Sequence, residues 1–263
     1  MSVILQAQEV CQYFGGLKAV EKVNMQIEKG DVFGIIGPNG AGKTTFFNIC
    51  SGIFKPTHGQ IMFCQQNITD LSSDKIARLG MARTFQNIQL FKYMSVLENV
   101  KIGFHTRTST DIVGAILRNK RYKKDEKFAE EKGIEILERV GLIRFRDTLA
   151  GNLPYGIQRK VEIARALALD PILLLLDEPA AGMNPIETKE LSEFIINLNK
   201  EGYTIAVIEH DMKFVMNTCN RIFVLNFGQK ICEGTPVDIK NDKNVHEAYF
   251  GKGIIAGEGL KDA

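Results

Sequence analysis

The feature that most constrains this chain is a glycine-rich segment that directly follows a short apolar run. The run Asp31–Ile36 is almost continuously apolar, which predicts a strand buried on both faces of a sheet. The segment after it has the pattern G-x-x-x-x-G-K-[ST] and leads into a helix-forming stretch, which is the order that a phosphate-binding loop requires. Its residues are Gly37, Pro38, Asn39, Gly40, Ala41, Gly42, Lys43, Thr44 and Thr45.

The chemistry of such a loop explains its composition. Glycines let consecutive backbone N–H groups point at phosphate oxygens, and the helix that follows adds the positive end of its dipole. We expect Lys43 to bridge the β- and γ-phosphates and the Thr44 hydroxyl to bind Mg²⁺. The sequence therefore predicts a protein that binds a nucleoside triphosphate.

Charge and hydropathy exclude several other classes. The 263 residues include 33 Lys and Arg and 31 Asp and Glu, so the net charge of +2 provides no basic field for nucleic acid. The longest purely aliphatic run, Ile172–Leu176, is far shorter than the ~20 residues that span a bilayer. The five cysteines are an odd number without a CxxC pair, which argues against a disulfide framework or a zinc site.

Strand-like and helix-like segments alternate along the chain. Polar and apolar residues alternate in Val23–Ile27, as in a half-buried strand. The stretch Lys123–Val140 has helical periodicity, and apolar strand-like runs return at Ile172–Leu176 and Thr204–Ile208. This pattern predicts an α/β core with a mostly helical insertion. We expect one domain over residues 1–263, with a core of 1–86 and 154–250, a helical subdomain of 87–153 and a flexible tail of 251–263.

Two carboxylates follow the apolar run Ile172–Leu176. A strand that ends in Asp177 places this carboxylate beside the phosphate loop, where it can hold Mg²⁺ through water. Glu178 is then placed to activate an attacking water as general base. The alternative is a strand that ends in a solvated acidic turn, which the upstream phosphate loop disfavours.

The order of these motifs resembles the ATP-binding-cassette (ABC) ATPases over essentially the whole chain. The shared motifs are GPNGAGKTT at 37–45, Gln86 in RTFQN, LPYGIQ at 153–158, LLLLDEP at 173–179 and His210 in IEHDM. Within that family, FGGLKAV at 14–20, RTFQNIQLF at 83–91, DEPAAGMNP at 177–185 and IEHDMKFVM at 208–216 are similar to the larger ATPase subunit of bacterial branched-chain amino acid importers. The resemblance implies a RecA-like P-loop core with a mixed sheet, an N-terminal antiparallel β subdomain and an inserted helical subdomain.

The resemblance also implies roles for single residues. Phe14 matches the aromatic that stacks on adenine, although a bare aromatic at this place also suits a core. Gln86 matches the glutamine that contacts Mg²⁺ and the attacking water, and His210 matches the histidine that contacts the γ-phosphate and Glu178. Without the resemblance, Gln86 would be interpreted as a surface residue and His210 as a structural histidine. The implied catalytic residues are Glu178, His210, Gln86 and Lys43, and the implied metal ligands are Thr44, Gln86 and Asp177.

The signature segment departs from the family pattern. Pro154 stands where a serine is typical and has neither hydroxyl nor N–H, and Ile157 replaces a glutamine. Pro154 nevertheless suits the first turn of the helix that follows. The N–H groups near Gly156 and the helix dipole can still hold a phosphate. The resemblance implies that Gly156 and Asn184 act in trans, on ATP bound by an opposing subunit.

A chain with one phosphate loop and one signature implies partners. The resemblance implies a head-to-tail dimer with a second ABC subunit, identical or paralogous, two transmembrane permease subunits and, indirectly, a periplasmic or extracellular substrate-binding protein, with no nucleic acid. The expected function is ATP hydrolysis, with ATP and Mg²⁺ as cofactors, at the cytoplasmic face of the cell membrane to power uptake of branched-chain amino acids. A sister transporter for amides, urea or lipopolysaccharide, or a non-transport ABC ATPase, remains an alternative. The basic run Arg118–Lys124 is interpreted as a solvated helix face, or as a site that attracts anionic lipid headgroups or an acidic partner loop.

Overall fold

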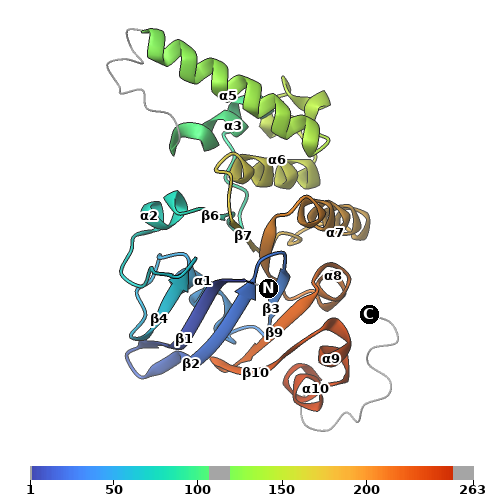
Figure 1. Cartoon of the computed structure of the whole chain (residues 1–263). Coiled ribbons are helices and arrows are strands. Elements are labelled where there is room, and N and C mark those ends of the chain that lie inside the picture. The colour runs from blue at the N-terminus through green and yellow to red at the C-terminus, as the bar shows by residue number, and fades with distance from the viewer. Residues whose placement is uncertain (1, 107–118, 251–263) are drawn as a thin grey trace.

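The computed structural model describes residues 2–106 and 119–250 and contains two sheets in this part of the chain (Figure 1). The first is antiparallel, with the strand order β2-β1-β4-β5. The second has the order β10-β9-β3-β8-β7-β6, in which only the β10–β9 pair is antiparallel. The strands of the first sheet are β1 (Val3–Phe14), β2 (Leu17–Glu28), β4 (His58–Phe63) and β5 (Gln66–Asn67). Those of the second are β3 (Val32–Ile36), β6 (Met81–Arg83), β7 (Leu173–Asp177), β8 (Thr204–Ile208), β9 (Arg221–Asn226) and β10 (Gln229–Gly234).

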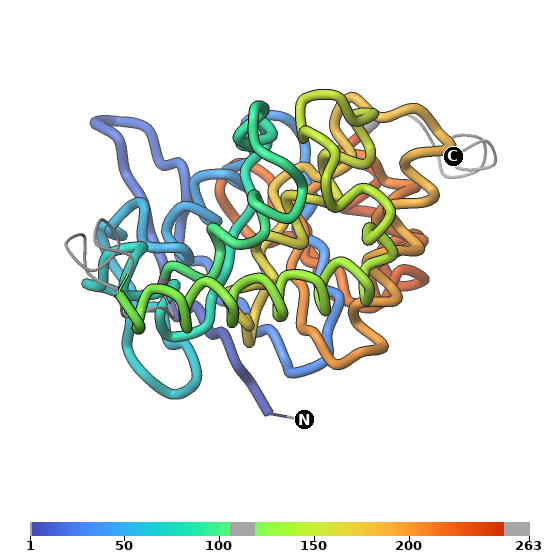
Figure 2. The backbone as a smooth tube through the Cα atoms, turned by 90° about the horizontal axis from the view of Figure 1, so that it is seen from above, coloured from blue at the N-terminus to red at the C-terminus, as the bar shows by residue number. Residues whose placement is uncertain are grey.

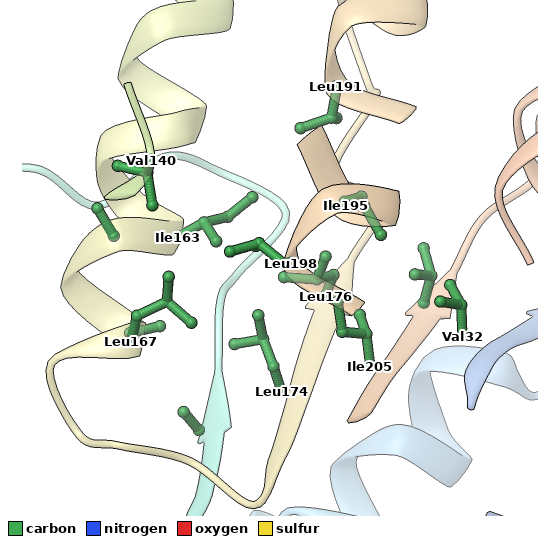
Figure 3. Packing of buried hydrophobic residues seen from close by; sticks show 14 of the residues in the cluster. Val32, Val140, Ile163, Leu167, Leu174, Leu176, Leu191, Ile195, Leu198 and Ile205 are labelled. Atoms are coloured by element: carbon green, nitrogen blue, oxygen red, sulfur yellow. The ribbon is translucent and has the colours of Figure 1, made fainter. Parts of the chain in front are cut away.

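The central strands β3, β7 and β8 are buried at every residue, as their continuous apolar sequences predict. Successive side chains point to opposite faces of the sheet and enter two different cores. On one face, Leu174 and Leu176 join a core that includes Ile163 and Ile195 of the covering helices (Figure 3). On the other face, Leu173 and Leu175 pack in a core shared with the antiparallel sheet and with α1.

Helices cover this framework on both sides. They are α1 (Lys43–Cys50), α2 (Ser73–Arg78), α3 (Val96–Ile102), α5 (Lys120–Arg139), α6 (Tyr155–Leu167), α7 (Pro185–Lys200), α8 (Met212–Thr218), α9 (Pro236–Asn241) and α10 (Lys243–Phe250). Short 3₁₀ turns occupy η1 (Gly103–Thr106), η2 (Ile143–Phe145) and η3 (Ala150–Asn152). Helices α3, α5 and α6 form a separate group above the sheet in Figure 1, and Figure 2 shows α5 from above as the long green helix that crosses the molecule. None of the described helices has the length and apolarity needed to cross a membrane.

The α/β fold with a mixed sheet, an N-terminal antiparallel sheet and inserted helices is confirmed. The division at residues 87 and 153 stays a prediction, and α6, which begins after it, packs against α3 and α5. In the basic run, Lys120, Arg121, Lys123 and Lys124 lie exposed in the first turns of α5, whereas Arg118 is outside the described residues. The predicted flexible tail, 251–263, also lies outside them.

Candidate active site

The phosphate loop lies between β3 and α1, the order that the sequence predicts. Gly42, directly before α1, has φ 97°, and a Cβ atom at this position would lie 2.3 Å from the carbonyl oxygen of Ala19. Only glycine fits this combination of left-handed backbone and close approach. No side chain caps the N-terminus of α1, so its first N–H groups can bind an anion. Thr44 and Thr45 occupy the first turn of α1, with Thr44 exposed.

The Lys43 side chain curls back into the loop. Its Nζ donates to the carbonyl oxygens of Gly37, at 2.6 Å, and Pro38, at 3.1 Å, and the residue is only 6% exposed. Burial lowers the pKa of Lys43, and the carboxylates of Glu178 and Glu209 oppose that shift. The ammonium group therefore lies within the loop, where phosphate oxygens can replace its two carbonyl partners.

Phe14 ends β1 in the hairpin that packs on the phosphate loop through Ala19. Its ring is 45% exposed and contacts Phe54 edge-on, with 5.9 Å between ring centroids. An aromatic in a core would be covered on both faces. Phe14 thus offers an accessible ring face of the kind that stacks on a base.

Asp177, at the end of β7, is not a solvated acidic turn. It is 5% exposed, and its Oδ2 accepts a hydrogen bond at 2.7 Å from Nη2 of Arg83, the last residue of β6. Arg83 also donates to Ser51 Oγ at 2.6 Å and lies over the ring of Phe47, 5.1 Å from its centroid. A buried carboxylate requires such a partner, so Arg83 fixes the orientation of Asp177.

Gln86, Glu178 and His210 meet where their strands end. Gln86 Nε2 donates to Glu178 Oε2 at 3.0 Å, and His210 Nδ1 lies 3.6 Å from the same oxygen. Glu178 has φ 43°, an uncommon backbone for a non-glycine residue, and its N–H donates to the carbonyl oxygen of Ile208 at 2.9 Å. Three of the four residues to which the resemblance assigns a catalytic role are therefore brought together, with Glu178 between Gln86 and His210.

A second carboxylate, Glu209, lies beneath this group. It is 1% exposed and accepts hydrogen bonds from the backbone N–H groups of Ala180, at 2.8 Å, and His210, at 3.1 Å. Burial raises the pKa of Glu209, while these two N–H donors oppose the shift. Glu209 thereby ties the segment after Glu178 to the backbone of His210.

The two residues expected to act in trans are linked within this chain. Asn184 caps α7 by accepting from the N–H groups of Ile186 and Glu187, and Glu187 Oε2 accepts from the Asn184 N–H in return. The other oxygen of Glu187, Oε1, lies 3.4 Å from the N–H of Gly156. Glu187 thus joins the start of α7 to the start of α6.

The signature segment accommodates its unusual residues. Pro154 is the N-cap of α6, one residue before the first-turn position that the sequence favours, and it provides no side-chain cap. Its φ of −54° lies in the range that the proline ring imposes. Ile157 is partly buried and packs against the core of the helical group, which explains an apolar residue at this position.

Sequence reasoning missed Arg83, Glu209 and Glu187. For Glu209 a signal existed, since it directly follows the apolar run Thr204–Ile208, just as Asp177 ends the run that begins at Ile172. Neighbouring parallel strands end at one edge of the sheet, so both carboxylates belong to the same site. For Arg83 and Glu187, no local pattern distinguishes them from surface charges.

Comparison with known proteins gives consistent results. A family model described as "ABC transporter" matches residues 20–181, and one described as "Branched-chain amino acid ATP-binding cassette transporter" matches residues 229–254. The high-affinity branched-chain amino acid transport ATP-binding protein LivG of Escherichia coli K12 is 43% identical over 250 residues, which cover 95% of this chain and 98% of that protein.

Solved structures agree with these matches. The ADP conformation of an ATP-binding cassette of an ABC transporter has a TM-score of 0.83 and 33% identity, covering 96% of this chain and 100% of that chain. A dimeric cassette in a post-hydrolysis state, bound to ADP and phosphate, has a TM-score of 0.72 and 26% identity, covering 89% of this chain and 99% of that chain.

Proposed function

Because this chain belongs to the ABC transporter family, we propose that it is the ATP-hydrolysing subunit of an importer of branched-chain amino acids. As a cassette of this family, the chain is an ATPase. The observation that supports our assignment of its catalytic centre most directly is the convergence of Gln86 and His210 on one oxygen of Glu178.

The proposed reaction uses the residues in distinct roles. The phosphate loop and Lys43 hold the phosphates of ATP, and Phe14 stacks on the adenine. Glu178 accepts a proton from the attacking water. Gln86, whose Nε2 lies 3.0 Å from Glu178 Oε2, orients that water. His210 contacts the γ-phosphate and keeps Glu178 aligned. Glu209 holds the His210 backbone in place through its hydrogen bond to the N–H group.

The available oxygen donors fit Mg²⁺. Thr44, Gln86 and Asp177 offer a hydroxyl, an amide and a carboxylate, and the described residues contain no His, Cys, Asp or Glu cluster of the kind that encloses other metals. Magnesium typically binds through one or two protein ligands plus substrate phosphates and water. When bound, the ion neutralises charge on the phosphates. Arg83 donates to Oδ2 of Asp177, and no hydrogen bond from the described residues goes to Oδ1, which would therefore accept one from a magnesium-bound water.

We further propose a head-to-tail dimer, in which Gly156 and Asn184 face ATP held by a second cassette, identical or paralogous. Within this chain Glu187 accepts hydrogen bonds from the backbone N–H groups of both residues and so holds them on one surface. The dimer cassette among the structural relatives supports this arrangement. ATP closes such a dimer and hydrolysis opens it, which gives a cycle that two permease subunits can use at the cytoplasmic face of the membrane.

The identity of the transported substrate is tested by measuring uptake in cells in which the gene for this protein is replaced by genes for its variants. Lys43→Ala and Glu178→Gln should abolish uptake of labelled leucine, isoleucine and valine. Lys189→Ala, which removes an exposed lysine paired with Glu193 at 4.0 Å on α7, should not. Loss of amide or urea uptake with intact leucine uptake would assign the chain to a sister transporter instead.

A further inference from the structure

Helix α6 carries a charged side chain with no exposure to solvent. Arg159 is 0% exposed, and its guanidinium donates to two successive backbone carbonyls of the loop after β6. Nη1 lies 2.7 Å from the Phe85 oxygen and Nη2 lies 2.6 Å from the Gln86 oxygen. The planar fork of arginine suits two acceptors side by side. The backbone that carries Gln86 is therefore held directly from α6.

Two neighbouring residues on α6 also hold this loop through hydrogen bonds. Glu162, 1% exposed, accepts from Nη1 of Arg159 at 2.7 Å and from the Gln89 N–H at 3.2 Å. Arg165 donates to the Gln89 carbonyl oxygen at 2.5 Å. The loop from Phe85 to Gln89 is thus attached to one helix at both ends.

Energetic considerations alone do not account for this arrangement. Burying an ion pair costs desolvation that its attraction often fails to recover, and apolar residues of similar volume are often at least as stable. The Nε–H of Arg159 is also buried, and it has no hydrogen-bond partner among residues 2–106 and 119–250. The guanidinium is therefore oriented so that it bonds the two loop carbonyls, while its Nε–H donor stays unsatisfied.

We propose that Arg159 is a positioning residue that couples α6 to the hydrolytic centre of the same chain. This inference rests on the proposed function. Gly156, which faces the partner's ATP in that function, lies one turn before Arg159 on the same helix. A shift of α6 on dimer closure moves the Gln86 backbone through Arg159, and Gln86 in turn bonds Glu178 at 3.0 Å. Binding at the signature surface thereby sets the geometry of the chain's own general base.

The test compares Arg159→Lys with the double variant Arg159→Met/Glu162→Leu and the control Lys160→Gln in the full chain. Lysine keeps a charge for Glu162 but lacks the planar fork that serves Phe85 and Gln86 together. The double variant removes both charges, so neither is left buried alone. Lys160 is the next residue on α6, pairs with Glu190 at 3.2 Å and makes no bond to the loop.

Four quantities are measured: the melting temperature, the amide hydrogen exchange of residues 85–89, kcat and the affinity for ATP. We expect Arg159→Lys to keep its fold, to exchange faster in this loop, and to lose about 10- to 100-fold in kcat. Its ATP affinity should stay within about threefold of wild type, because only the catalytic geometry changes. The double variant, where it folds, should behave the same way, and Lys160→Gln should match wild type.

Several outcomes would overturn the coupling. One is an Arg159→Lys variant with the same kcat as an active wild type. Another is an equal loss of kcat and ATP affinity, which points to general damage. Unchanged exchange at residues 85–89 would contradict the positioning role even in a preparation without turnover. A wild type that binds ATP but releases no phosphate under any condition would instead contradict the proposed function.

Discussion

The Nε2 atom of Gln86 lies 3.0 Å from the Oε2 atom of Glu178, although 92 residues separate them in the chain. The reason is topological, because β6 and β7 are adjacent parallel strands and each residue follows one of them. The carboxyl ends of parallel strands share one edge of the sheet. The hydrogen bond between Gln86 and Glu178 therefore joins the loop that α6 holds to the proposed general base.

The ion pair of Arg83 and Asp177 is expected to be important for stability. Arg83→Met should lower the free energy of unfolding by about 3–5 kcal/mol, because it leaves a carboxylate buried and unpaired. The side chains are 8% and 7% exposed, so water cannot replace the lost partner. Denaturant unfolding measures the effect. The control Arg146→Met breaks an exposed pair with Asp147, with side chains 42% and 79% exposed, and should cost less than about 1 kcal/mol. Equal costs for both variants would contradict this expectation.

Two loop glycines should respond differently to alanine. A Cβ at Gly42 meets the Ala19 carbonyl oxygen at 2.3 Å, whereas a Cβ at Gly40, with φ 79°, meets no atom within 4 Å. Gly42→Ala should cost about 2 kcal/mol or more and displace the loop from the hairpin. Gly40→Ala should cost only about 1–2 kcal/mol of left-handed strain. Thermal unfolding and ATP titration compare the two, and a more severe effect at Gly40 would count against the described loop geometry.

Pro154→Ser should tighten the ATP-bound dimer with little effect on stability. A serine N-cap should raise the free energy of unfolding by about 0.5–1 kcal/mol. Loss of the proline should lower it by about 0.4–1 kcal/mol, because the unfolded chain gains conformational freedom. The added hydroxyl and N–H are new donors for the partner's phosphate. Dimer affinity is best measured in a Glu178→Gln background, with Pro154→Ala as the control without a hydroxyl. An unchanged affinity would remove position 154 from the interface.

Thiol reactivity should depend steeply on pH. Burial raises the pKa of Cys64 above its ordinary value and, with Asp242 nearby, raises that of Cys232 to about 11. A raised pKa lowers the thiolate fraction at pH 8, so the rate of reaction with a disulfide reagent should keep rising beyond pH 9. Cys64 is exposed and should react first, while the buried Cys11, Cys50 and Cys219 react only after unfolding. Three or more fast thiols in the native protein would contradict the described core.

The sequence was sufficient for those features that a short pattern encodes. The fully buried β3 and β8, the alternation in β2 and the loop ending at Lys43 are each determined by neighbouring residues. A role for Glu178 could be inferred because this residue follows a readable strand, whereas the role of His210 came only from the family resemblance. The three-residue strand β6 shows no period and could not be recognised in this way.

The sequence did not reveal which charged residues are buried, and this was the main limit on predicting the site. In the run Arg159-Lys160, both residues look like helix-surface cations, yet Arg159 is fully buried and Lys160 pairs near the surface. The difference arises because a loop 74 residues earlier in the chain docks on Arg159. A pattern within one helix contains no information about such long-range packing, and the same holds for Arg83 beneath Asp177.

The most direct test of the central claim is ATP-driven dimerisation of the full chain carrying Glu178→Gln, followed by light scattering with and without Mg-ATP. Removing the general base should trap bound ATP without altering the phosphate loop. With an identical partner, our account predicts a shift from monomer to dimer that requires Mg-ATP and that disappears when Lys43→Ala is added. A persistent monomer that still binds ATP would assign the second site to a paralogous cassette or to an assembly that requires the permease subunits. A protein that binds no ATP, or a Glu178→Gln variant that hydrolyses ATP at the wild-type rate, would contradict it.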